Sequence, residues 1–136
     1  MTPSGARVSP TEQVEPEELQ AQAAPEGALA AARAADAKLG GDTVVLAMGN
    51  LLGVTDAFVI TTGRNARQVR TIADEVELRV REATGRSPWS VEGLRELHWV
   101  LMDYGDFLVH VFQEQDREYY DLERLWGNAE RLDWRT

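Results

Sequence analysis

The segment Trp99–Trp126 constrains the fold more than any other part of the chain. It reads WVLMDYGDFLVHVFQEQDREYYDLERLW. Two apolar runs, Trp99–Met102 and Phe107–Phe112, flank the turn Asp-Tyr-Gly-Asp, and a glycine in the third turn position between such runs is typical of a β-hairpin. Both runs are almost continuously apolar rather than alternating, which is typical of strands covered on both faces. The segment therefore predicts a sheet with helices packed on it.

Apolar spacing predicts the elements that precede this hairpin. Ala-rich helical spacing indicates a helix over Gly27–Leu39, with Leu39 on its buried side and Gly40 and Gly41 as a left-handed end. Residues 50–55 are predicted to be a loop or turn. Short apolar or β-branched runs predict three strands: Thr43–Met48, Asp56–Thr62 and Ser87–Glu92. The last of these contains Pro88 and is therefore restricted to a sheet edge or a strand start.

The helix that follows residue 65 has the clearest signals. Asn65 is a predicted N-cap, Gln68 stands three residues on as in a capping box, and Gly85 is the predicted stop. Its predicted buried stripe has i, i+3, i+4 and i+7 spacing and consists of Val69, Ile72, Ala73, Val76, Val80 and Ala83.

A final helix is predicted from about Asp116 to Gly127, with Tyr119, Leu122 and Trp126 sharing a core-facing side. The element order predicts a single α/β domain over residues 26–127, with a mixed sheet of about five strands flanked by helices. Residues 1–25 are acidic and proline-rich and are predicted to be a disordered tail, and residues 128–136 a polar C-terminal tail.

Composition excludes several classes of function. The chain has 136 residues and no cysteine, so disulfides, thiolate catalysis and zinc–thiolate sites are excluded. It has no apolar run near eighteen residues and no secretory leader pattern, which favours the cytoplasm and no membrane association. The net charge of −9 disfavours wrapping nucleic acid. It favours either docking on a basic protein or solubility alone.

Paired acids and histidines are the candidates for chemistry. Asp103 and Asp106 at the ends of the hairpin turn could hold Mg²⁺, or they could simply accept backbone hydrogen bonds as turn residues. The sequence lacks the GxxxxGK[ST] and GxGxxG phosphate loops. Gly63 precedes a helix N-terminus that could hold an anion. His98 and His110 fit ordinary sheet positions better than a metal site, and no Ser-His-Asp triad is indicated.

Surface-directed candidates are a basic cluster and the hairpin aromatics. Arg64, Arg67 and Arg70 crowd the first turns of a helix, where cations oppose the helix dipole. They indicate either contact with RNA or an acidic partner, or a solvated face on which Arg70 pairs with Asp74. Tyr104, at the turn tip, is expected to be exposed as a binding anchor, whereas Trp99 fits either core or surface.

Four segments carry a family resemblance: DAFVITTGRNARQVRTIADEVE, then VEG, then WVLMDYGDFLVHVF, then REYYDLERLW. In this order they resemble the ribosomal silencing factor family, also called the Iojap family, over about residues 28–127. The resemblance implies a nucleotidyltransferase-like topology without enzymatic activity or cofactor. It also implies binding to ribosomal protein fourteen of the large subunit, which blocks the small subunit from joining and lowers translation when nutrients are scarce.

The resemblance places a partner-binding face on Trp99, Tyr104 and Asp106, with Asp103 and Gly105 shaping the turn. Adjacent candidates are Tyr120, Glu123 and Arg124, and the arginines at 64, 67 and 70 are candidates for a peripheral contact with ribosomal RNA. Ala47 and the N-terminal extension depart from the family pattern. Open alternatives are a Mg²⁺-dependent nucleotide-handling enzyme on the same scaffold, a large-subunit assembly factor, and a monomeric or homodimeric state.

Overall fold

The chain folds around one mixed β-sheet. A computed structural model describes residues 24–135, so most of the predicted N-terminal tail lies outside the described residues. The sheet has six strands in the order β4-β5-β6-β3-β2-β7. The central strands β3 (Ala57–Gly63) and β6 (Phe107–Gln113) run parallel, and every other pairing is antiparallel. The predicted α/β class and mixed sheet are confirmed.

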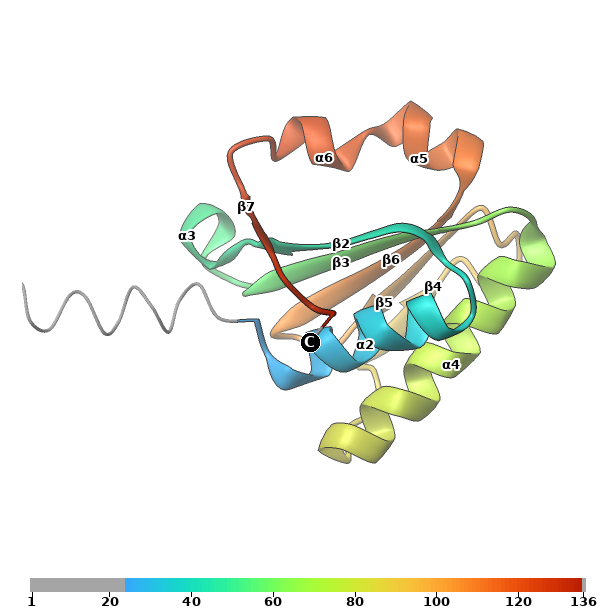
Figure 1. Cartoon of the computed structure of the whole chain (residues 1–136), viewed down its shortest axis with the longest axis horizontal. Coiled ribbons are helices and arrows are strands. Elements are labelled where there is room, and N and C mark those ends of the chain that lie inside the picture. Colours follow the sequence, from blue (N-terminus) through green and yellow to red (C-terminus); the bar gives the residue numbers. More distant parts are fainter. Residues whose placement is uncertain (1–23, 136) are drawn as a thin grey trace, which may run out of the picture.

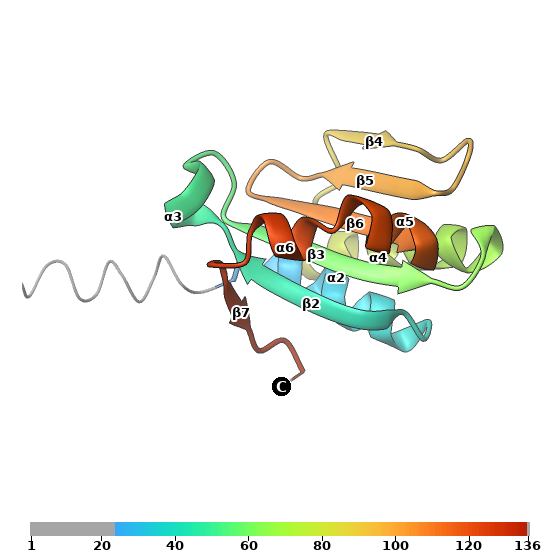
Figure 2. The same ribbon diagram turned by 90° about the horizontal axis from the view of Figure 1, so that it is seen from above.

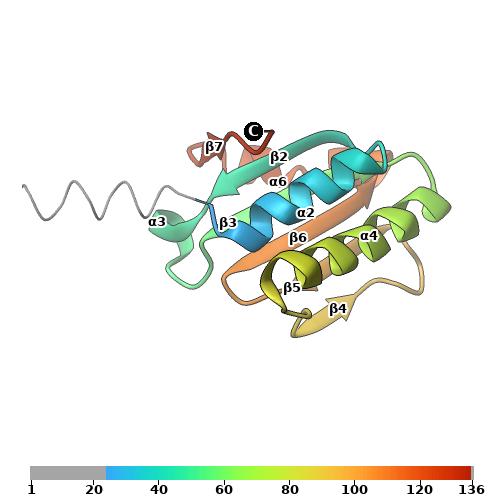
Figure 3. The same cartoon turned by 60° about the horizontal axis from the view of Figure 1, so that its bottom comes forward.

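Helices cover both faces of this sheet. Helices α2 (Glu26–Ala37) and α4 (Ala66–Thr84) lie side by side across one face (Figure 3). The short helices α5 (Glu114–Tyr120) and α6 (Leu122–Leu125) lie over the opposite face (Figure 1). Two cores result: a larger one under α2 and α4, and a smaller one around Phe58, Ile60 and Phe112 under α5 and α6. This arrangement explains why β6 is apolar almost throughout.

The predicted hairpin and central helix are present. Strand β5 (Trp99–Asp103) pairs with β6 in register, with Trp99 opposite Phe112. In α4, the Asn65 side chain accepts a hydrogen bond from the Gln68 backbone N–H at 2.9 Å, and Gly85 ends the helix in the left-handed conformation. The stripe from Val69 to Val80 is buried, whereas its last predicted member, Ala83, is exposed.

The end of α2 differs from the prediction. The left-handed residue is Leu39, with φ of 64° and 75% of its surface exposed, so Leu39 does not belong to the buried face. Gly40 is needed for a different reason, which is close packing. A Cβ on Gly40 would meet the Thr61 hydroxyl and lie 3.0 Å from the Ala35 carbonyl oxygen. Strand β2 (Gly41–Ala47) then begins beside β3.

Two segments expected to be irregular form regular structure. The short helix α3 (Gly49–Leu52) includes the first three residues of the loop predicted over residues 50–55. The predicted C-terminal tail contributes a sixth strand, β7 (Glu130–Leu132), which pairs with the outer edge of β2 (Figure 2). Trp134 follows it and is 4% exposed, with its indole N–H donating to the Thr43 carbonyl at 3.0 Å. Burial of one tryptophan therefore fixes a segment whose overall composition is polar.

The predicted single final helix is broken in two. Asp121 has φ of 48° and separates α5 from α6. Aspartate adopts this left-handed conformation more readily than most residues. The break turns the second helix, so the two segments do not share one face. Tyr119, predicted to be in the core, is consequently 81% exposed.

Strand β4 (Ser90–Glu92) lies at the sheet edge, as Pro88 predicted.

Candidate partner-binding face

The hairpin turn is closed by its own backbone and side chains. The Asp103 carboxylate accepts a hydrogen bond from the Gly105 N–H at 2.8 Å, which is the turn-forming role of aspartate. The Tyr104 N–H donates to the Phe107 carbonyl at 3.0 Å. Gly105 adopts φ of 90°, where a side chain would be strained. A Cβ on it would also lie 2.7 Å from the Trp89 ring, which packs over the turn and is 77% exposed.

Tyr104 is not an exposed anchor. Its side chain is fully buried in the larger core and stacks on Phe107, with ring centroids 4.6 Å apart. Its hydroxyl has no hydrogen-bond partner among the described residues, and burial raises the pKa of Tyr104 to about 12. The prediction that Tyr104 is exposed is wrong because its side chain enters the larger core, which also contains residues of α2 and α4. Tyr104 is therefore removed from the candidate face.

The carboxylate of Asp106 is bound by Arg86, an arginine for which no sequence pattern predicted a role. Arg86, in the connection after α4, forms a two-pronged ion pair with Asp106 at 2.9 and 3.2 Å, and it also donates to the Tyr104 carbonyl. This hydrogen bonding to Asp106 raises the pKa of Arg86. Both partners are more than one-third exposed. The pair ties the turn to the end of α4 and leaves part of Asp106 at the surface.

The turn carboxylates do not form a cation cradle together. Asp103 bonds to the Gly105 N–H, and Asp106 bonds to Arg86. Across residues 24–135 there is no group of three or more His, Asp or Glu side chains placed to hold a metal ion. Both carboxylates therefore help to shape the turn.

Three other aromatic residues do gather at the surface. Trp99 and Tyr120 lie with ring centroids 4.7 Å apart, and Tyr120 meets Tyr119 edge to face at 5.0 Å. Tyr119 is 81% exposed and Tyr120 is 47% exposed, while Trp99 is partly buried. We call these three residues the aromatic face. It joins the start of β5 to the end of α5.

Behind the aromatic face lies a buried histidine. His110 in β6 is 4% exposed, and its Nδ1 accepts a hydrogen bond from the Trp99 indole N–H at 3.1 Å. The imidazole meets the Phe58 ring edge to face at 4.6 Å. Burial lowers the pKa of His110 to about 4, so the ring is neutral near pH 7. The apolar pattern of residues 107–112 predicted that His110 lies in the sheet, but no local pattern indicated its contact with Trp99.

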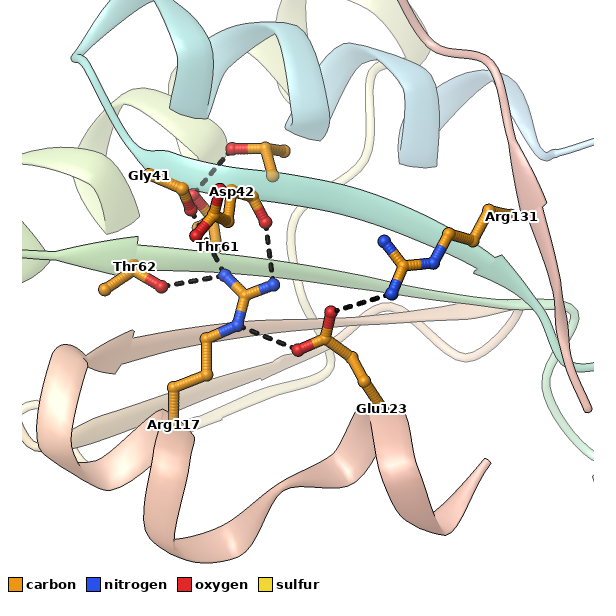
Figure 4. Close-up of polar contacts among 8 residues, drawn as sticks. Gly41, Asp42, Thr61, Thr62, Arg117, Glu123 and Arg131 are labelled. Carbon is orange, nitrogen blue, oxygen red and sulfur yellow. Dashed lines mark hydrogen bonds and ion pairs between the residues drawn. The ribbon is translucent and has the colours of Figure 1, made fainter. Parts of the chain in front are cut away.

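Helices α5 and α6 are held on the sheet by Arg117 (Figure 4). Its guanidinium donates to the Thr62 hydroxyl at 2.7 Å and to the backbone carbonyls of Gly41 and Asp42 at 3.1 and 2.7 Å. It also pairs with Glu123 at 3.0 Å, and the second oxygen of Glu123 reaches Arg131 at 3.3 Å. Both Glu123 oxygens are therefore used inside the chain, whereas neighbouring Arg124 is exposed.

The predicted basic cluster is only partly available. Arg70 pairs with Asp74 at 3.3 Å, as expected if this part of the helix is a solvated face. Arg64 and Arg67 are exposed. Arg64 lines an open polar hollow of about 810 Å³ between the start of β2 and the underside of α5, together with Asp42, Gln113 and Glu118. Acidic side chains outnumber basic ones around this hollow, so it is not an anion cradle.

The fold and this face together define a small α/β domain with an exposed aromatic surface. No helix within residues 24–135 is both long and apolar enough to cross a bilayer. Residues 21–136 match the family model described as "Ribosomal silencing factor during starvation". The chain belongs to the ribosomal silencing factor family, as the resemblance predicted.

Individual relatives agree with this assignment. The chain is 42% identical to "Ribosomal silencing factor RsfS" of Bacillus subtilis over 103 residues, which is 76% of this chain and 86% of that protein. It is 31% identical to "Protein Iojap, chloroplastic" of Zea mays over 104 residues, covering 75% of this chain and 44% of that protein. A crystal structure of a protein from Chromobacterium violaceum superposes with a TM-score of 0.71 at 32% identity, covering 82% and 91% of the two chains.

Proposed function

We propose that this chain represses translation by docking on ribosomal protein fourteen of the large subunit, where it stands in the way of the small subunit. Membership of the ribosomal silencing factor family supports a role at the ribosome. The proposed docking surface rests on one observation: Tyr119 and Tyr120 are exposed, and the Tyr120 ring contacts both Tyr119 and Trp99. We place this action in the cytoplasm and assign the chain no catalytic step.

The proposed contact set differs from the one expected from the sequence. Trp99 and Tyr120 remain as anchors, Tyr119 joins them, and exposed Arg124 stays at their margin. Asp103, Gly105 and Asp106 remain candidate contacts at the hairpin turn, where Trp89 adds exposed aromatic surface. Tyr104 leaves the set because it is buried. Glu123 acts by holding the helices in place rather than by direct contact.

Steric blocking fits the physical character of the molecule. It requires only an interface, on the order of 800 Å² per partner, and no turnover. Tyrosine and tryptophan are the residues most often found at the energetic centre of such interfaces. The net charge of −9 favours encounter with a basic partner, and it makes association faster at low salt than at high salt.

The test is co-sedimentation with purified large subunits, followed by a subunit-joining assay monitored by light scattering. The paired change Tyr119→Ala and Tyr120→Ala is expected to weaken co-sedimentation at least tenfold and to restore subunit joining, since each anchor contributes about 1–2 kcal/mol or more. Leu78→Ala is the matched control, because Leu78 is 46% exposed on α4 at the opposite face of the sheet. Equal binding by the paired variant and the control would refute the proposed face.

A further inference from the structure

The geometry points to His110 as the positioning residue of the aromatic face. We infer that its buried imidazole orients the Trp99 indole by accepting the indole N–H, so that Trp99 presents only an aromatic surface to its partner. This inference rests on the proposed function for its consequence in binding. Its structural part concerns the free protein and can be tested without a ribosome.

The first step of the argument is the surroundings of His110. The residue lies in the middle of β6, level with Ile60 on one side and Leu101 on the other. Its ring contacts Phe58, Trp99 and Phe112, all aromatic, at centroid distances of 4.6, 5.9 and 6.2 Å. Within residues 24–135, the only polar partner of the buried ring is the Trp99 indole.

The second step concerns the tautomer. Because Nδ1 accepts the Trp99 N–H, the proton of the neutral ring must sit on Nε2. Nε2 is buried and has no hydrogen-bond partner among the described residues. A buried donor without a partner lowers stability, and a phenylalanine would fill the same space without that cost. What the imidazole supplies, and an apolar ring cannot, is an acceptor for Trp99.

The third step is the effect on the surface. The indole N–H is the only polar group of a tryptophan side chain, and here it is turned inward to His110. The remaining hydrocarbon surface of the indole packs against Phe112 at 4.8 Å and Tyr120 at 4.7 Å. Trp99 therefore offers its partner an apolar ring surface with a fixed orientation. Fixing a side chain before binding reduces the ordering cost of association.

The experiment on the free protein uses wild-type chain and NMR. Trp99→Phe assigns the Trp99 indole resonance, and Trp89, which is 77% exposed, is the comparator within the same molecule. We expect the Trp99 indole proton to exchange with solvent at least tenfold more slowly than that of Trp89. We also expect a nitrogen spectrum of His110 with the proton on Nε2. Equal exchange rates of the Trp99 and Trp89 indole protons, or a proton on Nδ1 of His110, would overturn the inference. This outcome does not depend on whether the protein binds ribosomes.

The experiment on binding uses His110→Phe, which keeps an aromatic ring and removes the acceptor. We expect unchanged or higher thermal stability, a Trp99 indole proton that exchanges faster, and affinity for large subunits reduced roughly 3- to 10-fold. A purely structural role would instead lower stability and binding together. In a Trp99→Phe background the same change should no longer affect affinity, because the donor is gone.

The two proposals fail in different ways. Failure of the proposed face appears as normal binding by the Tyr119 and Tyr120 double variant. Failure of the positioning role appears in the indole exchange of the free wild-type protein, or as His110→Phe retaining full affinity while the double variant loses it.

Discussion

Arg117 and Glu123 face each other at 3.0 Å across the break between α5 and α6. The Arg117 side chain is 11% exposed and the Glu123 side chain is 23% exposed, so solvent screens this pair less than the Arg86–Asp106 and Arg70–Asp74 pairs. Helix α5 has seven residues and α6 has four, so both are too short to be stable alone. Their position over the sheet, and with it the position of Tyr119 and Tyr120, depends on this contact.

We expect Arg117→Ala to destabilise the protein by about 2–4 kcal/mol, because Glu123 and the Gly41 and Asp42 carbonyls lose their donor. Urea unfolding measures the change. Arg70→Ala is the control, since the Arg70–Asp74 pair is exposed at 54% and 63% and should contribute less than about 0.5 kcal/mol. Equal effects of the two substitutions would contradict the role of Arg117.

Tyr104→Phe is expected to leave stability unchanged or to raise it slightly, by about 0–1 kcal/mol. The substitution removes a buried hydroxyl that has no partner among the described residues and keeps the stacked ring. Tyr104→Ala should cost about 3–5 kcal/mol, since it empties a fully buried aromatic site. Thermal unfolding separates the two. Loss of ribosome binding in Tyr104→Ala would therefore report unfolding and not a lost contact.

Gly105→Ala is expected to destabilise the hairpin turn by about 1–2 kcal/mol. Two effects contribute: φ of 90° disfavours any side chain, and the new methyl group would press on the Trp89 ring. In a Trp89→Ala background the steric part disappears and the conformational part stays. The penalty of Gly105→Ala should therefore shrink without vanishing, which chemical denaturation of the four variants can measure. An unchanged penalty would show that Trp89 does not crowd the turn.

Stability should fall as the pH drops from about 6.5 to about 4 because of His110. The folded pKa of His110 is about 4 and the unfolded value is near 6.5, so in this window the unfolded chain binds more protons. The free energy of unfolding therefore rises with pH across the window, by roughly 3 kcal/mol in total for this group. His110→Phe should remove that part of the pH dependence while the carboxylate contributions remain. A difference curve between the two proteins that is flat from pH 4 to 6.5 would contradict the burial argument.

Local sequence patterns predicted much of the fold. The apolar stripe and caps of α4, the β5–β6 hairpin and the edge position of β4 all rest on interactions between residues close in the chain. Such interactions are readable from spacing because helix and strand periods are fixed by the backbone. Family membership was also readable, since it depends on residue order alone.

What the sequence alone determined is therefore most of the helices and strands, the α/β class and the family, but not α3, β7 or the helix break at Asp121. Only the tertiary structure decided which aromatic side chains reach the surface. Tyr104 is buried and Tyr119 exposed, the reverse of the prediction, because the turn folds onto a core and Asp121 redirects the last helix. Trp134 and the Arg86–Asp106 pair likewise join residues distant in the chain. Burial depends on what the rest of the chain brings alongside, and no local pattern carries that information.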